Sequence, residues 1–423
     1  MATITPASVA DICAAAKRAA TELAALPSGV KNDALEAIAA ALIERTPEIL
    51  EANARDLEAG RESGLTDALM DRLALDDRRV AVVANQVRDI AALPDPVGEV
   101  IEGRRLYNGL EVRKVRVPLG VIAVVYEARP NVTIDAAALC LKSGNAIVLR
   151  GSSMATHSNA VLAAVAIEAG LAAGLPEGAM ALVSGGGHEE LEQLATQSGV
   201  VDLIIPRGGE GLKAALKGVA TVPVLYAASG NCHVYVDASA SLEDALAITL
   251  NAKVQRPGVC NSAETLLVHE AVAREFLPAA FEALADAGVE LRADTRARNF
   301  APGSVEVAEA TEEDWATEYH ALTLAVGVVD SVHKAIEHVN HYGSGHSEAI
   351  VTRDTQSART FELGVDAACV YVNASTRFTD GGEFGMGAEI GNSTQKLHAR
   401  GPIGLRELCT FKYLIEGTGQ VRG

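Results

Sequence analysis

Aromatic side chains are scarce in this chain: they make up 4% of its 423 residues, and only one of them is Trp. This scarcity argues against broad platforms on which nucleobases stack. Basic residues are outnumbered, 36 against 55 acidic ones, which leaves a net charge of −19. Because a field of that sign repels phosphate backbones and anionic lipid surfaces, we expect neither a nucleic-acid nor a membrane partner. Any anionic ligand must therefore bind at a locally basic site.

Paired cysteines are also missing, since the six cysteines are scattered and none forms a Cys-x-x-Cys pair. This spacing favours neither a zinc ribbon nor a disulfide framework. No run of about eighteen uncharged apolar residues occurs, and the amino terminus has no basic segment ahead of an apolar core. These absences predict a cytoplasmic protein with reduced thiols. The ten histidines show no metal-ligand spacing, so we expect no metal site.

The composition that remains is typical of a soluble globular protein, with 49% hydrophobic and 22% charged residues. The length indicates two or three domains. Residues 7–95 are rich in Ala, Leu, Glu and Arg at helical spacing. From residue 119 short apolar strands alternate with helices, and a second unit of the same kind begins near residue 232. The sequence therefore predicts an α/β fold whose mostly parallel sheets carry helices on both faces.

A β-hairpin is predicted over residues 104–117, where polar and apolar residues alternate around Asn108 and Gly109. A basic hairpin of this length does not belong in a core. We expect its edge to pair with another subunit, because an unpaired edge strand promotes aggregation. A solvated arm is the alternative.

Three Gly-containing turns follow successive strands of the first α/β unit and begin at Arg150, Ser184 and Pro206. The carboxyl ends of parallel strands form the crevice where such sheets bind ligands, and the backbone N–H groups of these turns suit phosphates. One turn alone would be weak support, because Gly also simply reverses the chain. Three in succession predict a nucleotide cofactor, and none of them matches the P-loop pattern GxxxxGK[ST].

One thiol, that of Cys260, lies in the polar turn QRPGVCN just before an apolar strand. A polar turn exposes its side chains, and the neighbouring Arg256 would lower the pKa of the thiol. Both features make Cys260 a candidate nucleophile, whereas a small buried side chain is the common alternative. The cysteines in apolar patterns are expected in the core, namely Cys140, Cys232 and Cys369.

Asn131 ends the segment EARPN (127–131), which follows the first strand of the parallel sheet. Its amide N–H would suit a developing oxyanion. Arg-Pro-Asn is also an ordinary turn sequence, so the residues alone leave both interpretations open.

Three long stretches resemble the γ-glutamyl phosphate reductase family, also called glutamate-5-semialdehyde dehydrogenases, of the aldehyde dehydrogenase superfamily. They are VPLGVIAVVYEARPNVT (117–133), QRPGVCN (255–261) and the Gly-rich segment 375–405, and the resemblance runs along essentially the whole chain. It implies a Rossmann-like cofactor domain, an α/β catalytic domain and a small β oligomerisation element. The boundaries that follow are 1–103 with 118–231 for the NADP-binding domain, 232–374 for the catalytic domain, 104–117 with 406–423 for the oligomerisation arm, and 375–405 for the substrate and active-site loop region.

The resemblance also implies Cys260 as the nucleophile, with the Asn131 side chain and the Cys260 backbone N–H as the oxyanion hole. NADP(H) is the implied cofactor. Its expected ligands are Arg150, Ser152, Gly185, Gly186, Arg207, Gly208, Gly209 and Glu318. The expected ligands of the small-molecule substrate are the cations and hydroxyls nearest the shared motifs, namely Arg129, Arg256, Ser375, Thr376 and Arg377.

The implied reaction is the NADPH-dependent reduction of L-glutamyl 5-phosphate to L-glutamate 5-semialdehyde and phosphate through a Cys260 thioester, in L-proline biosynthesis from glutamate. Oxidising aldehyde dehydrogenases carry a Glu general base ahead of their Cys, whereas residues 221–236 of this chain contain no Asp or Glu. That absence suits a reductase, which must keep water from the thioester. Hydrolytic or CoA-acylating dehydrogenases of the same superfamily and a nucleotide sensor without turnover are the alternatives.

The resemblance also leads to two expectations about protein partners. The oligomerisation element implies a homodimer or a homotetramer. The lability of an acyl phosphate leaves open whether the chain also contacts a glutamate 5-kinase, which would deliver the substrate directly.

Overall fold

The computed structural model describes residues 7–184, 187–226 and 230–423. They fold into two compact units. The first unit takes the chain up to Tyr226 together with the later segments Met386–Gly391 and Ile403–Gly423. The second unit takes Ala227–Gly385 and Asn392–Pro402, so the chain leaves the first unit and returns to it twice.

The first unit begins with five helices, in the region where helical spacing predicts them. They are α1 (Val9–Leu23), α2 (Ser28–Glu44), α3 (Thr46–Glu62), α4 (Asp67–Leu73) and α5 (Asp77–Ala92). Several starts carry the side-chain caps that a helix end needs for its unpaired N–H groups. Ser8 and Asp11 form a capping box on α1, and Thr66 and Asp76 cap α4 and α5.

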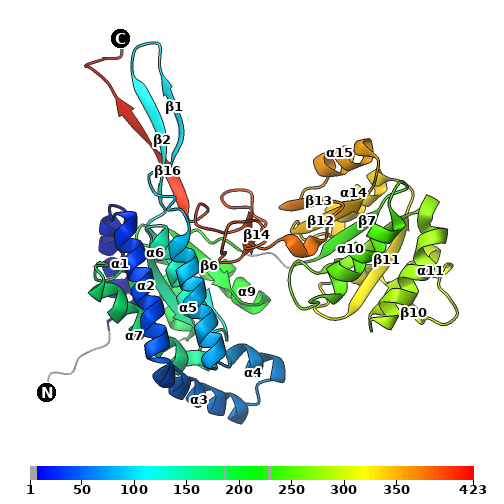
Figure 1. The fold of residues 1–423 in the computed structure, drawn as a ribbon, viewed down its shortest axis with the longest axis horizontal. Coiled ribbons are helices and arrows are strands. Elements are labelled where there is room, and N and C mark those ends of the chain that lie inside the picture. Colours follow the sequence, from blue (N-terminus) through cyan, green and yellow to red (C-terminus); the bar gives the residue numbers. More distant parts are fainter. Residues whose placement is uncertain (1–6, 185–186, 227–229) are drawn as a thin grey trace. The chain divides into compact units, whose positions relative to one another are not determined.

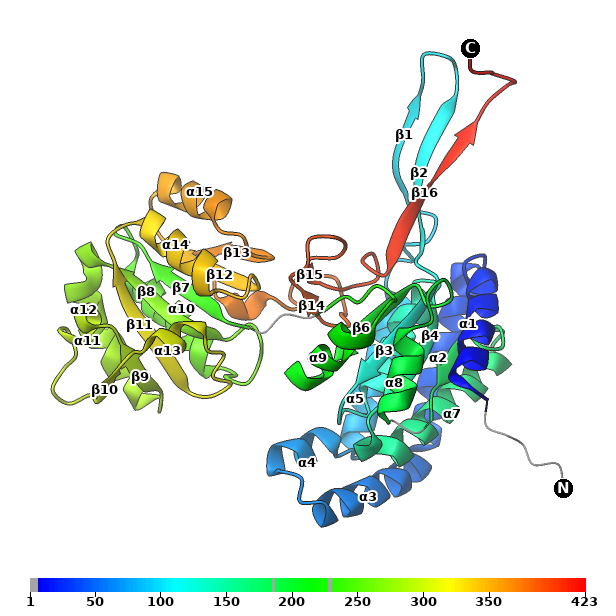
Figure 2. The same cartoon turned by 180° about the vertical axis from the view of Figure 1, so that it is seen from behind.

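A four-stranded parallel sheet forms the centre of the first unit, in the order β5-β4-β3-β6. Its strands are β3 (Val121–Tyr126), β4 (Ala146–Gly151), β5 (Met180–Leu182) and β6 (Leu203–Arg207). The helices between and after them are α6 (Val132–Lys142), η1 (Ser153–Ala155), α7 (Thr156–Ala172), α8 (His188–Ala195) and α9 (Glu210–Val219). Helices α6 and α7 pack together on the sheet with α2 and α5 outside them (Figure 1). Helix α1 also packs on the sheet and contacts α8 (Figure 2).

The predicted hairpin is present as β1 (Val100–Arg105) and β2 (Glu111–Pro118), and the last strand, β16 (Cys409–Glu416), pairs antiparallel with β2 (Figure 1). Gly109 takes a positive φ of 85° in the connecting turn, which suits Gly. The three-stranded sheet exposes several large apolar side chains: Val100, Ile101, Phe411, Tyr413 and Ile415. We call this sheet the arm.

The second unit is built on a seven-stranded parallel sheet in the order β10-β9-β11-β8-β7-β12-β13. The strands are β7 (Cys232–Val236), β8 (Ala263–His269), β9 (Glu290–Ala293), β10 (Val307–Glu309), β11 (Thr323–Val329), β12 (Ser347–Val351) and β13 (Cys369–Val372). The helices are α10 (Leu242–Val254), α11 (Glu270–Asp286), α12 (Thr295–Arg298), α13 (Glu312–Ala316), α14 (Val332–Tyr342), α15 (Thr355–Gly364) and η2 (Thr376–Phe378). Two short antiparallel strands follow, β14 (Asn392–Ser393) and β15 (Gly401–Pro402).

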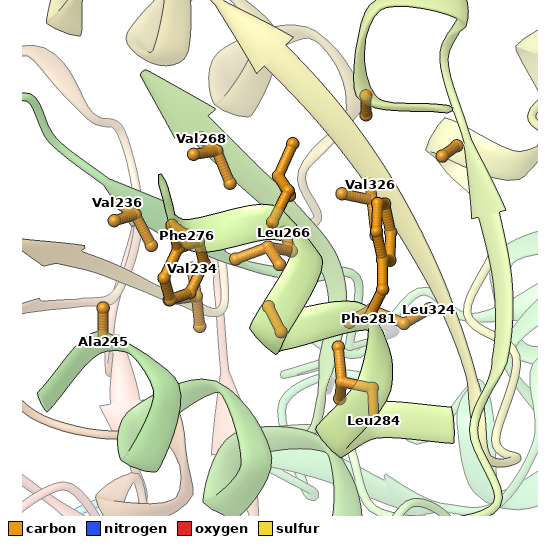
Figure 3. Close-up of a cluster of buried hydrophobic side chains, with 14 of the residues drawn as sticks. Val234, Val236, Ala245, Leu266, Val268, Phe276, Phe281, Leu284, Leu324 and Val326 are labelled. Atoms are coloured by element: carbon orange, nitrogen blue, oxygen red, sulfur yellow. The ribbon is translucent and has the colours of Figure 1, made fainter. Parts of the chain in front are cut away.

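Successive side chains of the central strands point to opposite faces of the sheet, so the core of the second unit has two layers. Val234 and Val236 of β7 point to the face that α10 and α11 cover, where Phe276 and Phe281 fill the layer (Figure 3). Tyr235, between the two valines, points to the opposite face and packs with residues of α14 and α15. Both faces of this sheet are therefore covered, which is the architecture that the alternation of strands and helices predicts.

Candidate active site

The loop that carries Cys260 joins the end of α10 to the start of β8 in the middle of the second sheet. We call residues 255–262 the nucleophile loop. Because the sheet is parallel, the starts of β7, β8 and β12 lie at the same edge. The candidate thiol therefore lies at the amino ends of these strands, beside the segment that leads into β7.

The start of β7 packs directly against the backbone of Cys260. The thiol of Cys232 donates a hydrogen bond to the Cys260 carbonyl oxygen, with Sγ and O 3.2 Å apart. A Cβ atom placed on Gly230 would collide with the Cys260 backbone. This close approach of two main chains is a position where only Gly fits.

The six thiols differ in exposure. Four are buried: Cys13, Cys140, Cys232 and Cys409. Burial raises the pKa of each of them, to about 11 for Cys13 and to about 12 for Cys409. A thiol with a raised pKa is a poor nucleophile, since the thiolate is the reactive form. Cys260 and Cys369 are the two half-buried thiols, and Cys369 lies inside strand β13.

Two arginines lie near the Cys260 thiol. Arg256, four residues earlier, is exposed, and Arg377 of η2 is half-buried with its Nε donating to Oε1 of Gln255 over 2.8 Å. Burial and the charge of Arg256 lower the pKa of Arg377, whereas the charge of Cys260 raises it. The thiol therefore lies within electrostatic reach of Arg377, and a positive field of this kind favours a thiolate.

Asn261 fastens the loop that carries Arg377 to the nucleophile loop. Its Nδ2 donates to the carbonyl oxygens of Arg377 and Thr379, over 3.3 and 2.9 Å. Thr376, which is fully buried, donates its hydroxyl to the Asn261 carbonyl over 2.7 Å. The Ser375 hydroxyl accepts from the Arg377 backbone N–H and caps η2. These bonds hold Arg377 in a fixed relation to Cys260.

A buried ion pair closes the two ends of the nucleophile loop. Lys253 Nζ and Glu264 Oε2 are 2.5 Å apart, and both side chains are fully buried. Burial lowers the pKa of Lys253 and raises that of Glu264 to about 7, while each partner's charge opposes the effect on the other. The charge of Glu318 acts on both, so this pair also borders the segment after α13.

Asn131 lies where β3 ends and α6 begins, in the first unit. It is the N-cap residue of α6, but its side chain makes no capping bond. Its Nδ2 instead donates to Oδ2 of Asp135, one turn along the helix, over 2.8 Å. Leucine and valine side chains surround this position: Leu42, Leu75, Val80, Val83 and Leu162.

The predicted cofactor ligands of the first unit lie at the carboxyl ends of its strands. Arg150, at the end of β4, is buried and donates from Nη2 to the Gly187 carbonyl over 2.6 Å. The Ser152 hydroxyl is buried and has no hydrogen-bond partner in the described part of the chain. Helix α8 begins after Gly187, which caps it without a side chain. Gly185 and Gly186 lie outside the described residues.

The turn after β6 packs against Glu127. A Cβ atom on Gly208 would lie 2.7 Å from Cδ of Glu127, and the Gly209 N–H donates to the Glu127 carboxylate over 3.0 Å. One of the N–H groups predicted to face a phosphate therefore already has an acceptor. Arg207, at the end of β6, exerts its charge on Asp135, and the Arg129 side chain is exposed.

Glu318 follows α13 in the second unit. Its side chain is 14% exposed, and its Oε2 lies 3.3 Å from Nε2 of His320. The predicted site residues thus form two sets, one on each unit. The described residues contain no group of three or more His, Cys, Asp or Glu side chains suited to a metal ion.

Comparison with known proteins shows the family to which the chain belongs. The sequence model of the aldehyde dehydrogenase family matches residues 1–299. The γ-glutamyl phosphate reductase of Heliobacterium modesticaldum is 55% identical over 407 residues, which cover 96% of this chain and 97% of the relative. The chain belongs to the aldehyde dehydrogenase family. Within that family it groups with the γ-glutamyl phosphate reductases, as the sequence motifs predict.

Two further relatives support this placement. The γ-glutamyl phosphate reductase of Thermobifida fusca is 53% identical over 414 residues, 98% of each chain. The crystal structure of the enzyme from Thermotoga maritima superposes with a TM-score of 0.96 at 46% identity, and the match covers 99% of this chain and all of that one. The chain is therefore an oxidoreductase of the aldehyde dehydrogenase type, a family that implies a nicotinamide cofactor.

Sequence reasoning missed several residues that shape this aldehyde dehydrogenase site. They are Gly230, Lys253, Asn261, Glu264 and Asp135. The sequence carries a signal for two of them: Asn261 directly follows the candidate nucleophile Cys260, and Asp135 is one helical turn beyond Asn131. The others act through neighbours that only the fold brings together.

We expect Lys253→Met to lower the free energy of unfolding by about 3–5 kcal/mol, because it leaves the Glu264 carboxylate buried without its partner. Lys253→Met combined with Glu264→Leu should recover most of that loss, since no unpaired charge remains. Urea denaturation measures both. The exposed pair Lys334 and Glu337 provides the control, and Lys334→Met should leave the midpoint unchanged. Equal losses in the single and double variants would contradict this account.

Proposed function

We propose that this chain reduces L-glutamyl 5-phosphate to L-glutamate 5-semialdehyde and phosphate with NADPH, in L-proline biosynthesis from glutamate. The observation that carries the proposal is the near-full-length similarity to γ-glutamyl phosphate reductases. The half-buried Cys260 beside Arg256 and Arg377 supports it, because this chemistry needs an accessible thiolate near an anionic substrate.

The first step is acyl transfer to sulfur. The Cys260 thiolate attacks the γ-carbonyl carbon, and a tetrahedral oxyanion forms that accepts hydrogen bonds from Asn131 Nδ2 and the Cys260 backbone N–H. The intermediate collapses when the carbon–oxygen bond to phosphate breaks, and inorganic phosphate leaves with the electron pair. Because phosphate is a good leaving group, no general acid is required.

The second half of the reaction needs a hydride, which NADPH supplies when it is bound. The described residues fit an anionic group at the start of α8: the Ser152 hydroxyl is buried without a partner among them, and α8 begins at Gly187, where a helix start suits a phosphate. At the start of α9 the Gly209 N–H donates to Glu127, which would have to release it to a ligand. The residues that would hold it are Arg150, Ser152, Gly185, Gly186, Arg207, Gly208, Gly209 and Glu318. Arg150 and Ser152 favour NADP over NAD, since a cation and a hydroxyl past a strand end suit a 2′-phosphate.

We assign the anionic groups of the substrate to cations around the nucleophile loop. Arg377 is the first candidate, because Asn261 and Gln255 hold it near Cys260. Arg256 lies in the loop itself and is exposed. Arg129, an exposed residue of the first unit, is proposed as a further ligand from its place beside Asn131 in the sequence. Ser375 and Thr376 are proposed as further ligands, although both hydroxyls take part in the bonds that fasten η2.

Protection of the thioester from water follows from what surrounds it. Residues 221–236 contain no carboxylate to act as a general base, and strand β7 in this stretch is buried throughout. We propose that water near the thioester lacks, in this stretch, the carboxylate that would activate it for attack. This property distinguishes a reductase from the hydrolytic dehydrogenases of the same family.

An assay in the reverse direction tests the proposed function. Purified protein should reduce NADP in the presence of glutamate semialdehyde only when inorganic phosphate is added, and the product should be the acyl phosphate. Phosphate-independent reduction with release of free glutamate would show a hydrolytic enzyme instead. A requirement for CoA would show an acylating dehydrogenase, and tight NADPH binding without turnover would show a sensor.

We further propose that the arm pairs with another copy of the chain to give a homodimer or a homotetramer. Its row of exposed apolar side chains, Phe411, Tyr413 and Ile415 on the edge strand β16, supports this assembly. Whether a glutamate 5-kinase also contacts the chain is a separate proposal, which co-purification tests.

A further inference from the structure

The Asn131 side chain behaves unusually for a residue at the start of a helix. An Asn at an N-cap ordinarily accepts a hydrogen bond from a backbone N–H of the first turn. Asn131 makes no such bond, and its Nδ2 donates forward to Oδ2 of Asp135 over 2.8 Å. The two residues are four apart and therefore lie on the same side of α6. The amide is thus held by a side chain rather than by the helix end.

Hydrogen-bond chemistry makes this contact directional. An ionised carboxylate only accepts, whereas a side-chain amide has two donors on Nδ2 and an acceptor on Oδ1. The bond to Asp135 therefore fixes which end of the amide faces the carboxylate, because the flipped orientation would set Oδ1 against Oδ2. One Nδ2–H is occupied by Asp135, and the second remains available in a fixed direction.

The surroundings of Asp135 preserve this arrangement. Its other oxygen, Oδ1, is shielded from solvent and meets no hydrogen-bond donor among the described residues. Burial raises the pKa of Asp135 to about 6, while the hydrogen bond from Asn131 and the charge of Arg207 oppose that rise. Both the Asn131 hydrogen bond and the Arg207 charge therefore favour the ionised carboxylate, and the Asn131 amide is its hydrogen-bond donor.

We propose that Asp135 is a positioning residue, which holds the Asn131 amide with its N–H side toward the carboxylate and so fixes the orientation in which the second N–H can serve as the oxyanion donor. The inference rests on the proposed function, in which Asn131 is an oxyanion donor. Asp135 itself touches neither substrate nor cofactor in this account. It acts by excluding the flipped amide, in which an oxygen would face the developing negative charge.

A double-mutant cycle tests the proposal, with kcat and KM measured at a pH well above 6. Asp135→Leu removes the acceptor, and we expect kcat to fall about tenfold with KM within about twofold, since the missing interaction belongs to the transition state. In the Asn131→Ala background the same substitution should change kcat by less than about twofold, because no amide remains to orient. Asp135→Asn keeps an acceptor oxygen, but its own N–H groups can also donate to the flipped amide, so kcat should fall only about twofold to threefold.

Asp202 provides the matched control. Its carboxylate also accepts from protein donors, the Val121 N–H and Lys17, but it lies at the opposite ends of the strands. Asp202→Asn should lower thermal stability and leave kcat unchanged. If the Asp135→Leu protein does not fold, Asp135→Asn carries the cycle, with a loss of up to about threefold that vanishes in the Asn131→Ala background.

Three results would overturn or redirect the inference. Losses that multiply in the double variant would show that Asp135 acts independently of Asn131 and would overturn it. An unchanged kcat in Asp135→Leu would do the same while leaving the oxyanion role of Asn131 intact. A loss of less than about threefold in Asn131→Ala alone would instead refute the oxyanion role itself, and with it the basis of this inference.

Discussion

Cys260→Ala should abolish the phosphate-dependent reduction of NADP by glutamate semialdehyde. The thioester route requires a sulfur nucleophile, and Cys260 is a half-buried thiol whose charge acts on Arg377. Residual activity should lie at the detection limit, several orders of magnitude below the parent. Cofactor binding, followed by protein fluorescence quenching or calorimetry, should persist because the expected NADP(H) ligands are intact.

Cys369→Ala is the matched control for this experiment. Cys369 is the second half-buried thiol of the same unit, but it lies in β13 and has no part in the proposed mechanism. Its variant should keep parental activity. Alkylation with iodoacetamide should inactivate the parent and the Cys369→Ala variant at the same rate. Normal turnover by Cys260→Ala would refute the thioester mechanism.

Asn131→Ala should lower kcat by about 10²–10³, because a preorganised oxyanion donor typically contributes that much. The KM for substrate should change little, since the bond strengthens only as the carbonyl oxygen gains charge. Steady-state kinetics in the reverse direction provide both values. Asn131→Asp should be worse than Ala, because it places a second carboxylate beside Asp135 and opposes the oxyanion.

The control for Asn131 is Asn340, which is exposed on α14 and donates to the Gly364 carbonyl. Asn340→Ala removes a hydrogen bond of the same kind from the second unit and should leave kcat unchanged. A loss of less than about threefold in Asn131→Ala would exclude the oxyanion role.

The fold was largely readable from the sequence, because buried parallel strands such as 121–126 and 232–236 are short apolar runs between helical stretches. Four strands escaped this reasoning: the two-residue strands β14 and β15 of the Gly-rich segment, and β9 and β10. β9 and β10 lie at one edge of the second sheet and mix exposed charges with apolar residues. Their hydrophobic pattern therefore matches neither the period of a helix nor that of a strand. The apolar run Val222 to Leu225 also predicts a strand, but in the structure it makes an isolated bridge between Ile204 and Val224. Hydrophobicity predicts burial there without predicting pairing.

The candidate site could be predicted only in part from the sequence. Cys260 and Asn131 could be singled out because a polar turn and a strand end are visible in sequence. Lys253 and Glu264 could not be singled out, because charged residues are normally exposed and nothing in the sequence reveals that both are buried. Their proximity depends on how α10 and β8 meet, which is a property of the tertiary fold.

The pairing of β16 with β2 has a consequence for the chain while the ribosome synthesises it. Cys409 pairs with Pro118 and Glu416 with Glu111, so the arm joins segments that the ribosome makes almost three hundred residues apart. Until the last strand emerges, β2 presents an open edge while the whole second unit is synthesised. A nascent chain is therefore exposed to association with its neighbours until β16 has been made, and the pairing of β16 with β2 ends that period.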